Sequence, residues 1–223
     1  MVPGWLQTLS MAYVILAIIC AMAVVADLVA RPQKMWIMNL VWPLTALYAG
    51  PFALWAYHAL GREPRRHASL PHATPGGAPA GMAREERGAA ERPFWQPALV
   101  GSTHCGAGCA VGDFIGEWLV FATGLMLLGS MLFTHYLVAF VLAYVFGIFF
   151  QYFAIAPMRG LGFRDGIWAA VKADTLSLTA YEIGMFAWMA VTQKLLFPGL
   201  DPSSWIFWFM ISASLPTVIA SYR

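Results

Sequence analysis

Charged residues are scarce in this sequence, at only 11% of the chain. Soluble domains carry roughly 25%. Hydrophobic residues make up 60%, including 10 tryptophans and 15 phenylalanines. A chain this poor in charge cannot cover an apolar core with a water-compatible surface, so its composition indicates an integral membrane protein. It excludes a soluble enzyme and a nucleic-acid-binding protein. The formal net charge of +2 is too small to imply an anionic partner.

Cysteine is scarce as well. The three cysteines are an odd number and too few for a disulfide framework, which excludes a disulfide-stapled secreted domain. Cys20 stands alone in the first apolar stretch and is expected to pack in the core. Cys105 and Cys109 lie four residues apart in a more polar setting.

Long apolar stretches are abundant, and six of them can cross roughly 30 Å of hydrocarbon as helices. They are residues 5–29, 35–60, 107–130, 132–156, 166–193 and 203–221. The first lacks a basic leader and is too long for a signal-peptide core, so it is interpreted as a membrane anchor. The sequence therefore predicts an all-α integral membrane protein, a bundle of about six transmembrane helices embedded in a lipid bilayer.

One long segment interrupts this pattern. Residues 61–100 are rich in proline, glycine, alanine and charge, with few bulky apolar side chains, so they predict a disordered loop. The loop divides the chain into an N-terminal two-helix hairpin at 1–60 and a four-helix membrane domain at 101–223.

The basic residues predict an orientation. Six crossings would place both termini, the long loop and the 157–165 turn on one side of the membrane. Only three basic residues would lie on the other side: Arg31, Lys34 and Lys194. The first side would carry Arg62, Arg65, Arg66, Arg84, Arg87, Arg92, Arg159, Arg164 and Arg223. The positive-inside rule then predicts an inner-membrane protein whose termini and long loop are cytoplasmic.

The third apolar stretch contains two interleaved patterns. Gly108, Gly112 and Gly116 recur every four residues, so they share one face of a helix. Such a face allows the backbone of a neighbouring membrane helix to approach closely. We therefore expect a tightly packed glycine seam here.

A polar stripe runs beside this seam, one residue out of step, through Cys105, Cys109, Asp113 and Glu117. If the helix begins near Gly106, Asp113 lies roughly 10 Å into the membrane and Glu117 lies near its middle. A charge at that depth costs on the order of 3 kcal/mol. The stripe is therefore expected to face protein rather than lipid.

Thiol and imidazole groups at one end of the stripe suggest a metal site. His104, Cys105 and Cys109 offer three sulfur and nitrogen ligands, which suit copper or zinc. His58 could supply a fourth ligand, and Asp113 lies one turn further on. Two alternatives remain open for the cysteines: small packing residues beside the glycines, or a redox-active thiol pair.

The fifth apolar stretch is amphipathic. Lys172, Asp174 and Glu182 fall on one half of its helix, which must turn into the bundle within a bilayer. We expect Lys172 to pair with Asp174 or Asp113, and Asp27 of the first stretch to close the outer end of an ion or proton path. The alternative is a purely structural buried ion pair.

Two segments, HCGAGCAVGDFIGEW and FFQYFAIAPMRGLGFRDGIWAAVKADTLSLTAYEIGMFAWM, resemble a bacterial membrane family known as domain of unknown function 4396. The resemblance covers about residues 97–223. It implies a polytopic bacterial membrane protein and brings no established activity. The family motifs would be carried here by His104, Cys105, Cys109, Asp113, Lys172, Asp174 and Glu182.

These patterns favour a membrane protein that binds or transports a soft transition metal, with copper preferred to zinc. The cysteines and His104 would capture the ion, and four acids would line its path: Asp113, Glu117, Asp174 and Glu182. Transport is expected rather than catalysis, with a metallochaperone or another membrane subunit as the protein partner. The alternatives are a membrane thiol oxidoreductase and a non-catalytic scaffold subunit.

Overall fold

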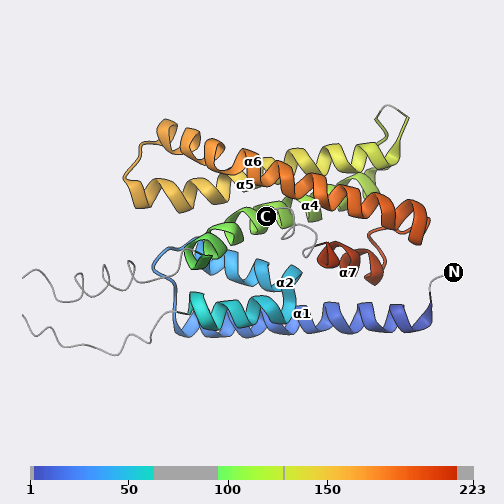
Figure 1. The fold of residues 1–223 in the computed structure, drawn as a ribbon, viewed down its shortest axis with the longest axis horizontal. Helices are drawn as coiled ribbons and strands as arrows, with labels where there is room; N and C mark the ends of the chain where they lie inside the picture. The colour runs from blue at the N-terminus through green and yellow to red at the C-terminus, as the bar shows by residue number, and fades with distance from the viewer. Residues whose placement is uncertain (1–2, 63–94, 128, 215–223) are drawn as a thin grey trace, which may run out of the picture.

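The computed structural model describes residues 3–62, 95–127 and 129–214, and their regular structure is helical. The α-helices are α1 (Gly4–Ala30), α2 (Met38–Ala56), α4 (Trp95–Thr123), α5 (Met131–Arg159), α6 (Phe163–Val191) and α7 (Trp205–Ala213). Two short π-helical segments, η1 (Tyr57–Gly61) and η2 (Thr192–Leu196), continue α2 and α6. The predicted all-α class is confirmed (Figure 1).

Three of these helices are long and apolar enough to cross a membrane: Gly4–Ala30, Val100–Thr123 and Met131–Arg159. Many of their large apolar side chains point outward. Ile19 on α1 is 58% exposed and Val145 on α5 is 57% exposed. Contiguous apolar surface of this kind is typical of a face that meets lipid or another protein. These features fit a membrane protein.

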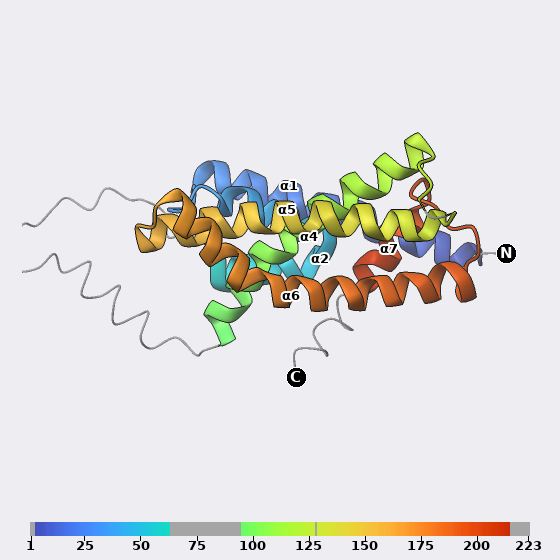
Figure 2. The same cartoon turned by 90° about the horizontal axis from the view of Figure 1, so that it is seen from above.

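The helices form a layered bundle (Figures 1 and 2). Helix α1 runs along one edge and packs against α2, while α5 and α6 lie together at the opposite edge. Helix α4 lies between these pairs and contacts α2, α5 and α6. The short helix α7 packs against α1 near the chain's N-terminal end. The central position of α4 places one of its faces in the interior, including Cys109 and Asp113.

Helix α2 does not cross the bundle, so the prediction of a crossing at 35–60 is wrong. Gly50 adopts φ 53° and ψ −129°, which breaks the helix just before Pro51. The second arm then returns beside the first, as the cyan segment of Figure 1 shows. Proline was expected only to kink this helix, whereas glycine's access to positive φ allows a complete reversal.

The C-terminal end of this hairpin is tied to the last turn of α1 and to the segment that follows α1. The guanidinium of Arg62 donates to both carboxylate oxygens of Asp27, at 2.7 and 2.9 Å. The Tyr57 hydroxyl donates to the same carboxylate at 2.9 Å. The Gln33 side-chain amide donates to the Gly61 carbonyl at 2.9 Å. Asp27 therefore anchors the hairpin, instead of closing an ion path as predicted.

The reversal changes the predicted topology. Asp27 lies near the end of α1 that is remote from the N-terminus, and Arg62 is bound to it. The N-terminus and the start of the 61–100 loop therefore lie at opposite ends of the bundle (Figure 1), so their predicted placement on one side is wrong. Hydropathy could not detect this, because a re-entrant hairpin and a crossing helix can be equally apolar.

The predicted glycine seam is present between α4 and α5. A Cβ atom added at Gly112 would lie 2.2 Å from the backbone nitrogen of Ala143 and 2.3 Å from its Cα. No side chain fits between backbones this close. In order along the seam, Gly108, Gly112 and Gly116 face Gly147, Ala143 and Ala139.

Some boundaries differ from the prediction. Helix α4 begins at Trp95 and ends at Thr123, so the predicted span at 107–130 starts too late. Residues 63–94 of the predicted disordered loop lie outside the described residues, as do residues 215–223 of the predicted sixth span. The prediction of a disordered loop is wrong for residues 95–100, which are helical in α4. The disorder of the remaining loop and the three-part division of the chain stay predictions.

Candidate functional site

A polar column occupies the interior between α4 and α6. Its members are Cys105, Cys109, Asp113 and Glu117 on α4, and Asp174 and Glu182 on α6. All six side chains are buried, and Cys109, Asp174 and Glu182 are 0% exposed. On α6 the two acids are eight residues apart with buried Leu178 between them, so one helical face carries all three. The predicted burial of the polar stripe is confirmed.

The thiols of α4 meet the acids of α6. Cys105 lies next to Asp174, and Cys109 lies next to Cys105 and Glu182. Asp113 lies within electrostatic reach of both Glu182 and Glu117. The column is therefore continuous from Cys105 to Glu117 along α4, and α6 contributes to its side.

Three carboxyl groups of the polar column lack compensating partners. Both oxygens of Asp174, both of Glu182 and one of Asp113 are buried without a hydrogen-bond partner among the described residues. Gly147 makes room for one of these groups, because a Cβ there would lie 2.6 Å from Asp174 Oδ2. An unpaired buried carboxylate is costly, so each group calls for a proton or a cation.

Glu117 does have a partner, the imidazole of His135. His135 Nδ1 lies 2.5 Å from Glu117 Oε2, and the two residues come from α4 and α5. The sequence analysis missed His135. The available signal was a lone histidine in the otherwise apolar 132–156 stretch, one turn after the helix start.

Two half-buried tyrosines, which were not predicted from the sequence, flank the polar column. A Cβ at Gly106 would lie 2.6 Å from the hydroxyl of Tyr48, which places this α2 side chain against α4. Tyr181 of α6 lies within electrostatic reach of Asp113 and Cys109. Aromatic residues are common on both interior and lipid-facing sides of membrane helices. Their spacing in the sequence therefore could not show that these two tyrosines face the interior.

Lys172 is not part of the polar column. Its side chain is exposed, and its ammonium lies 5.1 Å from the centre of the Trp168 ring. No ion pair joins it to Asp174 or Asp113 in the described part of the chain, so the predicted pairing is wrong. Lys172 and Asp174 are two residues apart on a helix and therefore point about 200° apart.

The predicted metal ligands are only partly brought together. His104 lies within α4, with Nδ1 3.1 Å from the Val100 carbonyl oxygen and Nε2 buried without a partner. His58 is exposed at the end of the α2 hairpin, where its ring meets Tyr57. Among the described residues no three histidine, cysteine or acidic side chains are grouped to hold a metal. A continuous helix turns His104 about 100° from Cys105.

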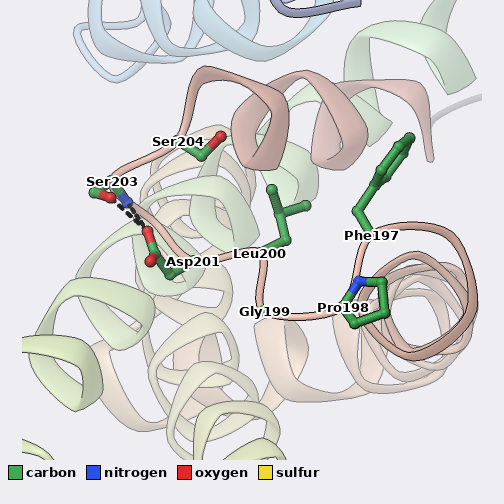
Figure 3. A pocket seen from close by; sticks show the side chains of 7 residues that line it. All are labelled: Phe197, Pro198, Gly199, Leu200, Asp201, Ser203 and Ser204. Carbon is green, nitrogen blue, oxygen red and sulfur yellow. Dashed lines mark hydrogen bonds between the residues drawn. The ribbon is translucent and has the colours of Figure 1, made fainter. Parts of the chain in front are cut away.

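Two surface cavities lie away from the polar column. One, of about 230 Å³, is formed by the turn between η2 and α7, from Phe197 to Ser204 (Figure 3). The cavity is lined in part by Asp201, whose carboxylate accepts hydrogen bonds from the backbone nitrogen and the hydroxyl of Ser203. The other, about 420 Å³, lies beside Arg164 and Trp168 at the start of α6. Neither cavity brings reactive groups together.

These features define an all-helical protein with membrane-length apolar helices and a buried column of acids and thiols. Residues 94–220 match the family described as Domain of unknown function (DUF4396), and the chain belongs to this family. The match covers more than half of the chain and every member of the polar column. It leaves α1 and α2 outside. No similar curated protein and no similar solved structure was found.

Proposed function

We propose that this chain is a multi-pass protein of the bacterial plasma membrane that carries protons along the polar column. The observation that carries this proposal is the set of three interior carboxyl groups without compensating partners: Asp113, Asp174 and Glu182. Ionisable groups inside a membrane bundle are costly and typically mark ion pathways or proton relays.

The chemistry of the column suits protons. A protonated carboxyl group both donates and accepts a hydrogen bond, as a tyrosine hydroxyl does. The acids of the column and the neighbouring hydroxyls of Tyr48 and Tyr181 therefore supply groups that can pass a proton onward. The described residues place no lysine or arginine in contact with the three unpaired carboxyls, so protons can provide the missing compensation.

The length of the column also fits. Cys105 and Glu117 are three helical turns apart, which corresponds to about 18 Å along α4. Hydrocarbon is about 30 Å thick, so the column would span its central part. Helix α4 begins at Trp95, which puts Cys109 near its midpoint and Glu117 towards its far end.

The distribution of basic residues supports an orientation. With α2 re-entrant, one end of the bundle carries Arg31, Lys34, Arg62, Arg159 and Arg164. At the opposite end, the described turns contain a single basic residue, Lys194. The positive-inside rule assigns the first end to the cytoplasm, which places the N-terminus outside.

A soft metal ion is the second candidate cargo. Cys105 and Cys109 lie next to each other, and each lies beside a carboxyl group of α6. Thiolate ligands favour copper(I) or zinc over magnesium and calcium. Binding would require these side chains to close around the ion, because the described residues contain no group of three ligands assembled for a metal.

Proton flux in proteoliposomes tests the first proposal. A potassium diffusion potential, set with valinomycin, would drive protons into vesicles that contain a pH-sensitive dye. We expect flux through the wild-type protein and its loss in Asp113→Asn and Glu182→Gln. Asp165→Asn, which changes an exposed acid of α6, is the matched control and should keep the flux. Wild-type vesicles that conduct no better than empty ones would refute the proposal.

Metal analysis tests the second candidate. The purified, reduced protein would be titrated with copper(I) or zinc and measured by native mass spectrometry. A site built on both thiols predicts about one ion per chain. Cys105→Ser and Cys109→Ser should lose it, and Cys20→Ser should keep it. Full occupancy in the double Cys105 and Cys109 variant would exclude this cargo.

A further inference from the structure

We propose that His135 is the group through which the polar column exchanges protons with water at the end of the bundle that holds the N-terminus. This inference rests on the proposed proton transport and assigns one terminus of the path. It follows from the position, the exposure and the two-sided chemistry of this histidine.

The position of His135 is terminal. It lies in the second turn of α5, just after the 124–130 turn that joins α4 to α5. Its partner Glu117 lies in the last third of α4, at the same end. Figure 1 shows this turn at the end of the bundle where the N-terminus lies. The other members of the polar column lie deeper in the bundle.

The exposure of the pair is graded. The side chain of His135 is 14% exposed and that of Glu117 is 8% exposed, whereas Glu182 is fully buried. Among the described residues, Glu117 and His135 form the contact between the polar column and an imidazole. His135 is the more accessible of the two. A proton arriving from water would meet His135 before it meets Glu117.

The turn holds the imidazole in place. The Thr134 hydroxyl accepts a hydrogen bond from the Leu127 backbone nitrogen at 2.7 Å and donates one to the Ser130 carbonyl at 2.9 Å. Ser130 also caps α5 by accepting from the Phe133 backbone nitrogen. These bonds fix the start of α5 and thereby the direction from which His135 approaches Glu117.

The ionisable surroundings of His135 come from all three packed helices. Glu117 faces it from α4, with Asp113 one turn behind. Tyr136 of α5 lies near Glu117, and its ring stacks on Phe186 of α6. From α6, Glu182 joins the group through its interaction with Asp113. The inner side of His135 is thus acidic, and the contact at hydrogen-bond distance on that side is the Glu117 carboxylate.

The transfer step is balanced. Neutral His135 with its proton on Nδ1 accepts a proton from water at Nε2, and Nδ1 then gives its proton to the Glu117 carboxylate. The imidazole is left neutral with its proton on Nε2, and the starting tautomer returns when Nδ1 gains one proton and Nε2 releases one, so the ring keeps a single proton. Histidine suits this role because its two nitrogens can act as donor and acceptor in turn.

Proteoliposome flux with His135→Ala tests the assignment. Because positioned proton-transfer groups typically contribute 10²- to 10⁴-fold, we expect a loss of flux of about 100-fold. Added imidazole should restore part of the flux when supplied on the N-terminal side and not from the opposite side. A purely structural role would show no such rescue. His58→Ala, an exposed histidine at the opposite end, is the control and should keep full flux.

His135→Gln keeps a polar side chain and guards against failure of the alanine variant to fold. It should be monodisperse in detergent and as poorly conducting as His135→Ala. Wild-type flux with unchanged flux in both His135 variants would overturn this inference and leave the proposed function standing. An absence of wild-type flux would overturn the proposed function itself.

Discussion

Alanine at Gly112 should destabilise the bundle strongly, because the seam between α4 and α5 has no room for a Cβ atom. That atom would lie 2.2 Å from Ala143 N, 2.3 Å from Ala143 Cα and 2.5 Å from Leu142 C. Ordinary contacts begin at 3.4 Å. All three obstructing atoms belong to the backbone, so no side chain can rotate away and the two helices must separate by about 1 Å.

Overpacking of this kind typically costs 1–3 kcal/mol, and a backbone obstruction belongs at the upper end. Alanine gains about 1 kcal/mol over glycine in helix propensity. The expected net loss in the free energy of unfolding is therefore about 2 kcal/mol. Gly101→Ala on the same helix is the matched control. A Cβ there meets nothing within 4 Å, so this change should be neutral or stabilising by up to about 1 kcal/mol.

Unfolding of both variants in mixed micelles, driven by increasing dodecyl sulfate and followed by circular dichroism, would measure these differences. Unfolding of Gly112→Ala at the same denaturant fraction as Gly101→Ala would contradict this prediction. Equal stability would mean that α4 and α5 do not approach closely at this position.

Three further predictions concern the re-entrant hairpin and the orientation. Asp27→Asn and Arg62→Ala should each destabilise, and a double-mutant cycle should show a favourable coupling between them, since the guanidinium donates to both carboxylate oxygens. Additive losses would contradict a stabilising contact between Asp27 and Arg62. Gly50→Ala should cost about 1 kcal/mol because φ is positive there, and unchanged stability would argue against the reversal. In intact cells a membrane-impermeant maleimide should label Met126→Cys, and it should label Gly162→Cys only after permeabilisation. The three native cysteines are buried and should add little background; the opposite labelling pattern would reverse the proposed orientation.

The sequence alone determined the helical class, the glycine seam and the burial of the polar stripe. Each of these follows from a periodic pattern on a single helix. Gly108, Gly112 and Gly116 share one face whatever surrounds them, and acids at four-residue spacing must avoid lipid. Composition and the cost of a charge in hydrocarbon were sufficient for these predictions.

Partners between helices could not be predicted in the same way. Lys172 was expected to neutralise Asp174, yet the two point in different directions, and the base that meets Glu117 is His135 of α5. One sequence gives the face on which a residue lies but not the depth or rotation at which two helices pack. Among the predicted metal ligands only His58 lies outside α4, and its distance from the others could not be read from the sequence. His104 was expected to precede the helix, whereas α4 continues through it and turns it about 100° from Cys105.

Only the tertiary structure decided the path of α2 and, with it, the ends of the bundle at which the N-terminus and Arg62 lie. An apolar run satisfies the bilayer whether it crosses once or enters and returns. The difference depends on a single positive φ at Gly50 and on the contact of Arg62 with Asp27, 35 residues earlier in the chain. Local sequence permits that backbone conformation, and the packing of distant residues selects it.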